Sequence, residues 1–423
     1  MTIDIPCDAE PSPPSSTRDA SRWAPLAGGR IASLDGLRAI SILLVIGLHW
    51  INAVTRPRTG ADYDGPWLML LNGDLGVSVF FVISGFLITH LLLREHDRTG
   101  TLDLKAFYVR RSFRIWPAYF TFLGVVAALQ VLHVFWVGIG NLLAAATFTF
   151  NYAPHVGSWW VGHSWSLSVE EQFYLAWPLA VRLLDRRHVG RVAIALILAA
   201  PLVRLAEVVC LPDANIFVLR LSRMVHTRLD GLMFGCAAAL FYGRPTFQRF
   251  VAAAERWGVT ALAVAYLIAS PELERRCPWL LRAALAFTLQ GACISLVLVW
   301  AIRHVDGPVG RFLNWRPVVH VGHISFSLYL WQQLFFVSLN TSWTGRFPAN
   351  LLLAFALAEL SFFAIEQPFL RLRDRVTGHR RNPRPAAATA DPALPRDGTP
   401  PRPSPVPMSA IDRQNGPRHP ARV

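Results

Sequence analysis

Two ionisable side chains lie within one apolar run of membrane length, residues 33–51 (SLDGLRAISILLVIGLHWI). Arg38 and His49 are eleven residues apart, which in a helix is about three turns plus 20°, so both lie on one face, about 16 Å apart along the axis. An ionisable residue inside a membrane span costs about 2.5–3.5 kcal/mol on insertion scales, so it usually faces a bundle interior and often serves function. The alternative is that Arg38 anchors the helix end and His49 lies at the interface. Asp35, three residues before Arg38, is predicted to pair with it locally.

Two further groups of side chains suit particular chemistry. Arg111 and Arg114, in the stretch RRSFR, lie three residues apart on one helical face and suit a polyanionic ligand such as a phosphorylated nucleotide. The same arginines could simply orient the span that follows them. Glu170 is harder to explain as structure, because a carboxylate within a membrane requires a partner. A histidine–carboxylate pair is the arrangement that sets a tautomer and stabilises imidazolium during proton transfer.

The composition identifies the class of protein that holds these residues. The chain has 423 residues, of which 53% are hydrophobic and only 16% are charged, against about 25% charged residues in ordinary soluble domains. The mean hydropathy is +0.36. The net charge is +14, but its arginines are scattered in short loops, which indicates membrane topology rather than a nucleic-acid-binding face. The sequence therefore predicts a multi-span membrane protein that binds no nucleic acid.

Charge also predicts the orientation of the spans. The segment 94–114 is the densest basic stretch beside any span, so the positive-inside rule places it in the cytoplasm. The first span then runs outward, with His49 towards the outer side. Arginines follow residue 184, so this end of the predicted span 163–184 lies on the cytoplasmic side. Glu170 is then in the outer half of its span, at a depth similar to that of His49. His226, Arg228 and Asp230, at the outer start of a later span, add ionisable groups to the same level.

The apolar runs predict an all-α fold: a polytopic membrane helical bundle of about ten transmembrane helices with both termini cytoplasmic. Segment 138–152 is predicted to be a partial or re-entrant helix. Ser84 and Gly85 predict a close-packing notch in the second span. The predicted spans are 33–51, 74–93, 115–134, 163–184, 192–209, 227–243, 257–270, 283–302, 318–339 and 349–367.

The two ends of the chain differ from the apolar middle. Residues 1–32 are rich in proline and serine and predict a disordered cytoplasmic arm, and residues 376–423, rich in proline, alanine and arginine, predict a disordered cytoplasmic tail. Residues 33–375 form the predicted transmembrane domain. The cysteines show no paired metal-ligand spacing and predict neither a metal site nor a disulfide framework: Cys7, Cys210, Cys236, Cys277 and Cys293.

Seven motifs give the chain a family resemblance. It resembles the bacterial membrane-bound acyltransferase-3 proteins, the O-acetylases of surface polysaccharides, whose first span carries an arginine or lysine, ten intervening residues and a histidine. Arg38 and His49 satisfy this pattern. The further motifs, in the family's order, are GVSVFFVISGFLIT at 76–89, RRSFRIWPAY at 110–119, WSLSVEEQFYLAWP at 165–178, RLDGLMFG at 228–235, ISFSLYLW at 324–331 and IEQPFLRLR at 365–373. The resemblance implies functional roles for Arg38, His49, Arg111, Arg114 and Glu170.

The resemblance implies an enzyme of the inner cell membrane, with no permanently bound cofactor or metal, that moves an acetyl or other short acyl group from acyl-CoA, with acetyl-CoA as co-substrate, to a hydroxyl of an exported glycan or lipid-linked saccharide. Arg38, Arg111 and Arg114 would bind the donor. His49 would act as general base or accept the acyl group itself, oriented by Glu170. The possible acceptor side comprises Asp230, Arg228, Trp331 and Gln332, the last where many members carry histidine.

Three alternatives to this reading stay open. The acceptor could be a small hydrophobic metabolite such as a macrolide. The chain could be a transporter or flippase, although no inverted repeats are visible, or a non-catalytic scaffold that binds acyl donors. No hydrolase-like domain follows the last span, so the acceptor is expected to be served by the membrane unit itself or by glycan-assembly proteins as partners.

Overall fold

The computed structural model describes residues 31, 33–59, 65, 70–153, 158–210, 222–337, 340 and 342–377. Every regular element in these residues is a helix, which confirms the predicted all-α class. The predicted arm 1–32 and the predicted tail 376–423 lie outside the described residues, apart from residues 31, 376 and 377. The proposed disorder of both segments stays a prediction.

Six helical stretches are long and apolar enough to cross a membrane, or seven if one bent pair is counted as a span. The bent pair is α11 (Pro245–Arg256) and α12 (Val259–Arg276), whose axes differ by 72°. The six stretches are α2 (Leu34–Thr59), α3 (Gly73–Thr99), α4 (Leu104–Val131), α8 (Arg186–Cys210), α13 (Trp279–Arg303) and the continuous stretch formed by α16 (Ala349–Ser361), a π-helical turn (Phe362–Glu366) and α17 (Gln367–Val376). The chain is therefore a multi-pass membrane protein.

Three more helices lie where crossings are predicted, but they are not among the six: α7 (Ser164–Leu183), α10 (Val225–Phe241) and α15 (Arg316–Trp331). The helices α10 and α15 have 17 and 16 residues, whereas a span needs about 20. Helix length and composition therefore do not confirm ten crossings or the location of the termini. Helix α5 (Ile139–Ala146) has eight residues and is the partial helix predicted in 138–152.

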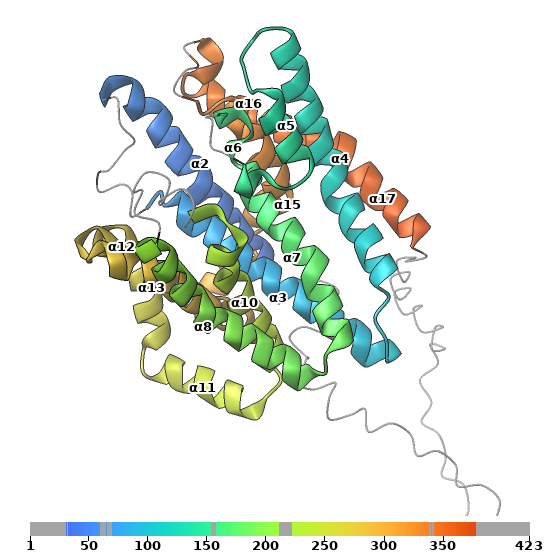
Figure 1. The fold of residues 1–423 in the computed structure, drawn as a ribbon, viewed down its shortest axis with the longest axis vertical. Coiled ribbons are helices and arrows are strands. Elements are labelled where there is room, and N and C mark those ends of the chain that lie inside the picture. Colours follow the sequence, from blue (N-terminus) through green and yellow to red (C-terminus); the bar gives the residue numbers. More distant parts are fainter. Residues whose placement is uncertain are drawn as a thin grey trace, which may run out of the picture. The chain divides into compact units, whose positions relative to one another are not determined.

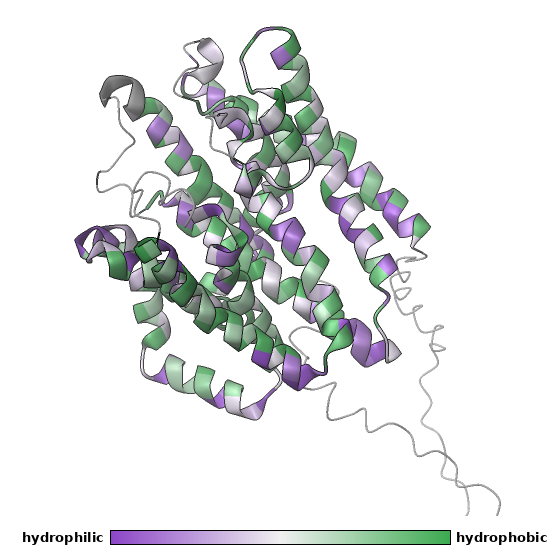
Figure 2. Ribbon diagram, viewed as in Figure 1, coloured by the Kyte–Doolittle hydropathy of each residue, from purple (hydrophilic) through white to green (hydrophobic). Residues whose placement is uncertain are grey.

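Helix α3 is the central element of the bundle. In its apolar window 78% of the residues are buried, more than in any other of the six stretches. It packs on α2, α10, α13 and α7 (Figure 1). Its start is capped by the side chain of Asn72, which accepts from the amide of Leu75, and its end by Gly100 in the left-handed conformation. Figure 2 shows hydrophilic residues gathered at the lower ends of α3 and α4.

Helices α3 and α10 approach each other closely because glycines face backbone carbonyls. A Cβ atom on Gly85 would lie 2.0 Å from the carbonyl oxygen of Leu232, and one on Gly235 would lie 2.0 Å from that of Val82. Small residues at such positions let transmembrane backbones pack tightly. The close-packing notch predicted at Gly85 is therefore confirmed, with Gly235 as its counterpart.

Substituting Gly235 with alanine is expected to lower the stability of the bundle. The added methyl group cannot fit against the Val82 carbonyl unless α3 and α10 move apart, and overpacking of this kind costs about 1–3 kcal/mol. The measurement is the thermal unfolding midpoint of the detergent-solubilised protein. Gly124→Ala is the matched control, because a Cβ atom there meets nothing within 4 Å. Equal midpoints for the two variants would contradict the proposed packing role.

Candidate active site

An interior cavity of about 100 Å³ lies among α2, α3, α4, α7 and α15. Its charged lining residues are Arg38 of α2, Arg111 and Arg114 of α4, and Glu170 of α7. The other lining residues are apolar, aromatic or hydroxyl-bearing: Val77, Phe80, Phe81, Ile83, Ser84, Ile115, Ser166, Leu167, Tyr174, Ser325, Phe326 and Tyr329. Four of the residues singled out in the sequence, from three separate helices, therefore meet at one cavity.

The cavity carries an excess of positive charge. Three of its four charged lining residues are arginines, and Glu170 interacts electrostatically with Arg111 and Arg38. The Arg111 guanidinium lies 4.0 Å from the centroid of the Tyr174 ring, and the Tyr174 hydroxyl hydrogen-bonds to Ser84. These contacts hold the Arg111 guanidinium in place. The net positive charge of three arginines and one glutamate suits an anionic group such as a phosphate.

A second cavity of about 360 Å³ adjoins the first, because Arg38 and Arg114 line both. It also reaches Arg94 in the last turns of α3 and His323 of α15. Asp35 lies 3.4 Å from Arg38, which confirms the predicted local pair, and 3.3 Å from His323. Together the two cavities lead from the helix ends at Arg94, past two arginines, into the bundle interior.

His49 lies about three turns beyond Arg38 on α2 and is held by polar and aromatic contacts. Its Nδ1 is 2.9 Å from Oε1 of Gln332, and its ring meets that of Trp159 edge-on, with centroids 5.1 Å apart. Gln332 in turn donates from Nε2 to Oε1 of Gln333, 3.1 Å away, and Gln333 donates to the Trp159 carbonyl, 2.5 Å away. A short chain of amides thus orients the imidazole.

This chain also determines the tautomer of His49. An amide oxygen only accepts hydrogen bonds, so Nδ1 facing Oε1 of Gln332 must carry the proton. The lone pair of the neutral imidazole is then on Nε2, the nitrogen that can accept a proton or attack a carbonyl. Gln332, predicted for the acceptor side, is fully buried and acts here as the orienting partner of His49.

Glu170, predicted to orient His49, lies elsewhere. His163, at the start of α7, interacts electrostatically with His49. Glu170 follows seven residues later, about 10 Å further along the helix axis. Its interactions with Arg111 and Arg38 place it on the arginine side of the site. The positive-inside rule predicts the depth of a residue in the membrane only coarsely, so it could not distinguish positions two turns apart on α7. The hydrogen bond of Nδ1 is accepted by Gln332 instead.

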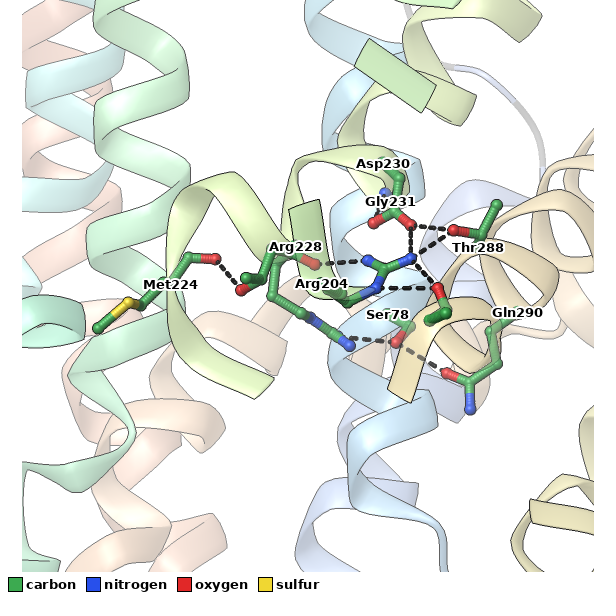
Figure 3. A network of polar contacts seen from close by, with 10 residues as sticks. Ser78, Arg204, Met224, Arg228, Asp230, Gly231, Thr288 and Gln290 are labelled. Carbon is green, nitrogen blue, oxygen red and sulfur yellow. Dashed lines mark hydrogen bonds and ion pairs between the residues drawn. The ribbon is translucent and has the colours of Figure 1, made fainter. Parts of the chain in front are cut away.

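Asp230 and Arg228 belong to a buried polar network (Figure 3). Asp230 accepts hydrogen bonds from Arg204, at 2.9 Å, and from Thr288, at 2.6 Å. Arg228 donates to Ser78, at 2.9 Å. These contacts join α3, α8, α10 and α13, so the two residues predicted for the acceptor side hold helices together. Trp331 is buried and packs edge-on against Phe122, with centroids 5.5 Å apart.

Arg204 is a residue that the sequence analysis missed. It lies inside the apolar run of α8, is completely buried, and donates to the carbonyls of Thr227 and Ala284 as well as to Asp230. The signal was present, because an arginine inside one predicted span and an aspartate inside another require partners. His226 similarly pairs with Glu207, at 2.6 Å.

Comparisons with known proteins agree with the motifs. A family model described as an acyltransferase domain, acyltransferase-3, matches residues 31–365. The O-acetyltransferase OatA of Staphylococcus aureus is 28% identical over 385 residues, covering 83% of this chain and 59% of that protein. The peptidoglycan O-acetyltransferase OatA of Listeria monocytogenes is 27% identical over 371 residues, covering 80% of this chain and 55% of that protein. The chain thus spans less than two thirds of the length of these relatives. No solved structure matches the chain.

Proposed function

Since the chain belongs to the acyltransferase-3 family, we propose that it is a membrane O-acyltransferase that moves an acetyl group from acetyl-CoA to a hydroxyl of an exported or cell-surface glycan. The observation that carries the proposal is the pair of adjoining cavities that share Arg38 and Arg114 and whose inner part is lined by Ser166 and Tyr329, the neighbours of His163. The names of the relatives make peptidoglycan the first acceptor to test.

The donor enters at the wider cavity. Its nucleotide phosphates lie near Arg94, Arg38 and Arg114, where guanidinium groups can bind them in pairs of hydrogen bonds. The thin pantetheine arm then extends past these arginines into the narrower cavity, and the thioester reaches the level of His49. The enzyme holds no permanent cofactor, and the acyl-CoA is a co-substrate. The arrangement belongs to an inner-membrane protein of about ten crossings with cytoplasmic termini.

At the thioester, the lone pair on Nε2 of His49 has two routes. As a general base it removes the proton of the acceptor hydroxyl, whose oxygen then attacks the thioester carbon. As a nucleophile it takes the acyl group and passes it to the hydroxyl as an acyl-imidazole. In both routes the carbon–sulfur bond breaks and the proton ends on the coenzyme A sulfur. The contact of Nδ1 with Gln332 supports either route equally.

The acceptor is tested with membranes that contain the protein and labelled acetyl-CoA. Peptidoglycan fragments, other envelope glycans and a macrolide are offered as separate acceptors, and covalent products are identified by mass spectrometry. The proposal predicts O-acetylated glycan. Acetylation of the macrolide alone would contradict the glycan acceptor. Transport of a substrate with no covalent product would contradict the enzyme class.

Replacing Arg114 with alanine is expected to weaken acetyl-CoA binding by about tenfold or more, the loss of one charge-assisted hydrogen bond or pair. Arg114 lines both cavities, so the donor passes it on any route. Binding of labelled acetyl-CoA to the detergent-solubilised protein measures the effect. Arg110→Ala is the matched control, because Arg110 is paired with Glu95 at 2.8 Å and lines neither cavity. Equal affinities of the two variants would remove Arg114 from the donor path.

A further inference from the structure

His163 is a buried histidine whose ring nitrogens have no hydrogen-bond partner in the part of the chain that the structure describes. The residue is 5% exposed, and neither Nδ1 nor Nε2 finds a partner among the described residues. A neutral imidazole presents one donor and one acceptor, and each buried polar atom left unpaired costs about 1–3 kcal/mol. Both ring nitrogens are therefore suited to pair with a polar atom of a bound substrate.

The ring is held firmly in spite of its unpaired nitrogens. Phe122 and Tyr329 each meet it edge-on, with centroids 5.2 Å away. The Tyr329 hydroxyl donates to the backbone carbonyl of His163, at 3.0 Å, and that same hydroxyl is 2.5 Å from Ser166. The backbone and the ring plane are thus fixed by neighbours that leave both nitrogens available.

The position of the ring links the cavity to His49. Ser166 and Tyr329 line the interior cavity and also contact His163, while His163 interacts electrostatically with His49. His163 therefore neighbours both the cavity lining and His49. On the proposed function, the thioester of the acyl donor reaches this place.

The surroundings determine what His163 can offer. Two aromatic rings cover it and favour the neutral imidazole over the charged form. A neutral imidazole N–H aimed at a carbonyl oxygen stabilises the negative charge that develops there when a nucleophile attacks. His49 supplies the base or nucleophile, so the second histidine is suited to the opposite role.

We propose that an imidazole N–H of His163 donates a hydrogen bond to the carbonyl oxygen of the bound thioester and strengthens that bond as the oxyanion forms. The inference rests on the proposed function and adds a catalytic residue to it. The attacking oxygen or Nε2 of His49 forms a bond to the carbonyl carbon, and the carbonyl electron pair moves onto the oxygen beside His163. When the pair returns, the carbon–sulfur bond breaks and the coenzyme A thiolate leaves. In the general-base route it takes the proton that Nε2 of His49 removed from the hydroxyl. In the acyl-imidazole route it takes the proton that the hydroxyl releases when it attacks the acyl-imidazole.

The test compares two variants of similar size in the full-length protein in proteoliposomes with acetyl-CoA and peptidoglycan fragments. His163→Gln keeps an N–H donor, and His163→Met removes it. The Met variant is expected to lose about 10²–10³ in kcat, the usual effect of deleting one oxyanion donor, with little change in KM for acetyl-CoA. The Gln variant is expected to recover at least about tenfold of that loss, because its amide N–H can still donate to the oxyanion.

A destabilised control variant separates this role from structure. Gly235→Ala overpacks the contact between α3 and α10 and does not touch the ring, so it is expected to lower the unfolding midpoint without the selective loss of kcat. Equal kcat values for the Gln and Met variants, or a Met variant as active as wild type, would overturn the role of His163. A wild-type protein that transfers no acetyl group at all would instead contradict the proposed function.

Discussion

His49→Ala is expected to abolish acetyl transfer while the protein still folds and binds acetyl-CoA. The substitution removes the Nε2 lone pair that the contact of Nδ1 with Gln332 makes available. Loss of a positioned acid–base group costs about 10²–10⁴ in rate, and loss of a nucleophile costs at least as much. His49 lies three turns from Arg38, so the donor-binding arginines stay intact. The measurement is kcat for transfer to glycan, beside equilibrium binding of labelled acetyl-CoA.

The matched control is His320→Ala on α15. His320 is largely exposed and contacts Glu359, at 2.5 Å, away from both cavities. It is expected to leave kcat unchanged. Full activity of purified His49→Ala would remove His49 from the chemistry, whereas lost donor binding in the same variant would show that the histidine acts through the shape of the site.

The second large effect is expected on stability. Asp230→Ala removes the carboxylate that accepts hydrogen bonds from Arg204 and Thr288 in the bundle interior. Arg204 is then a completely buried charge without its counter-ion, and breaking such a pair costs about 3–5 kcal/mol. Because this network joins α8, α10 and α13, the cost falls on the packing of three helices (Figure 3).

Thermal unfolding in detergent measures this loss. Asp374→Ala is the control, since Asp374 forms a partly exposed pair with Arg373 near the end of α17, and such pairs contribute about 0–1 kcal/mol. Any folded Asp230→Ala protein is expected to keep the wild-type KM for acetyl-CoA, because Asp230 lines neither cavity. An unchanged unfolding midpoint together with a raised KM for acetyl-CoA would contradict the structural role and indicate that Asp230 contacts substrate.

Helix positions follow closely from the sequence, because each apolar run must satisfy its backbone within a helix. The run 33–51 is the start of α2, and the predicted partial helix in 138–152 is α5. The number of crossings does not follow as well. Helices α10 and α15 are too short to be identified by length, and whether they span depends on neighbours rather than on their own residues.

The candidate site was predictable on its arginine side and not at His49. Arg111 and Arg114 share a helix face, so their common cavity with Arg38 follows from local geometry once the helices pack. The partner of His49 depends on which residues at the end of α15 or the start of α7 lie beside α2. The hydropathy pattern predicts where helices form, but it does not predict which turns of neighbouring helices face each other. Glu170 therefore lies beside the arginines, and Gln332 contacts Nδ1 of His49.

In the proposed reaction the donor binds at the arginine end and the acyl group leaves at the His49 end. Protein reconstituted in vesicles, with its orientation measured by protease cleavage of a terminal tag, tests it directly. Labelled acetyl-CoA is placed on one side and peptidoglycan fragments on the other. We expect labelled glycan only when the donor is on the side of Arg94 and His323. Equal labelling from either side, or labelled donor consumed with no acetylated glycan, would contradict it.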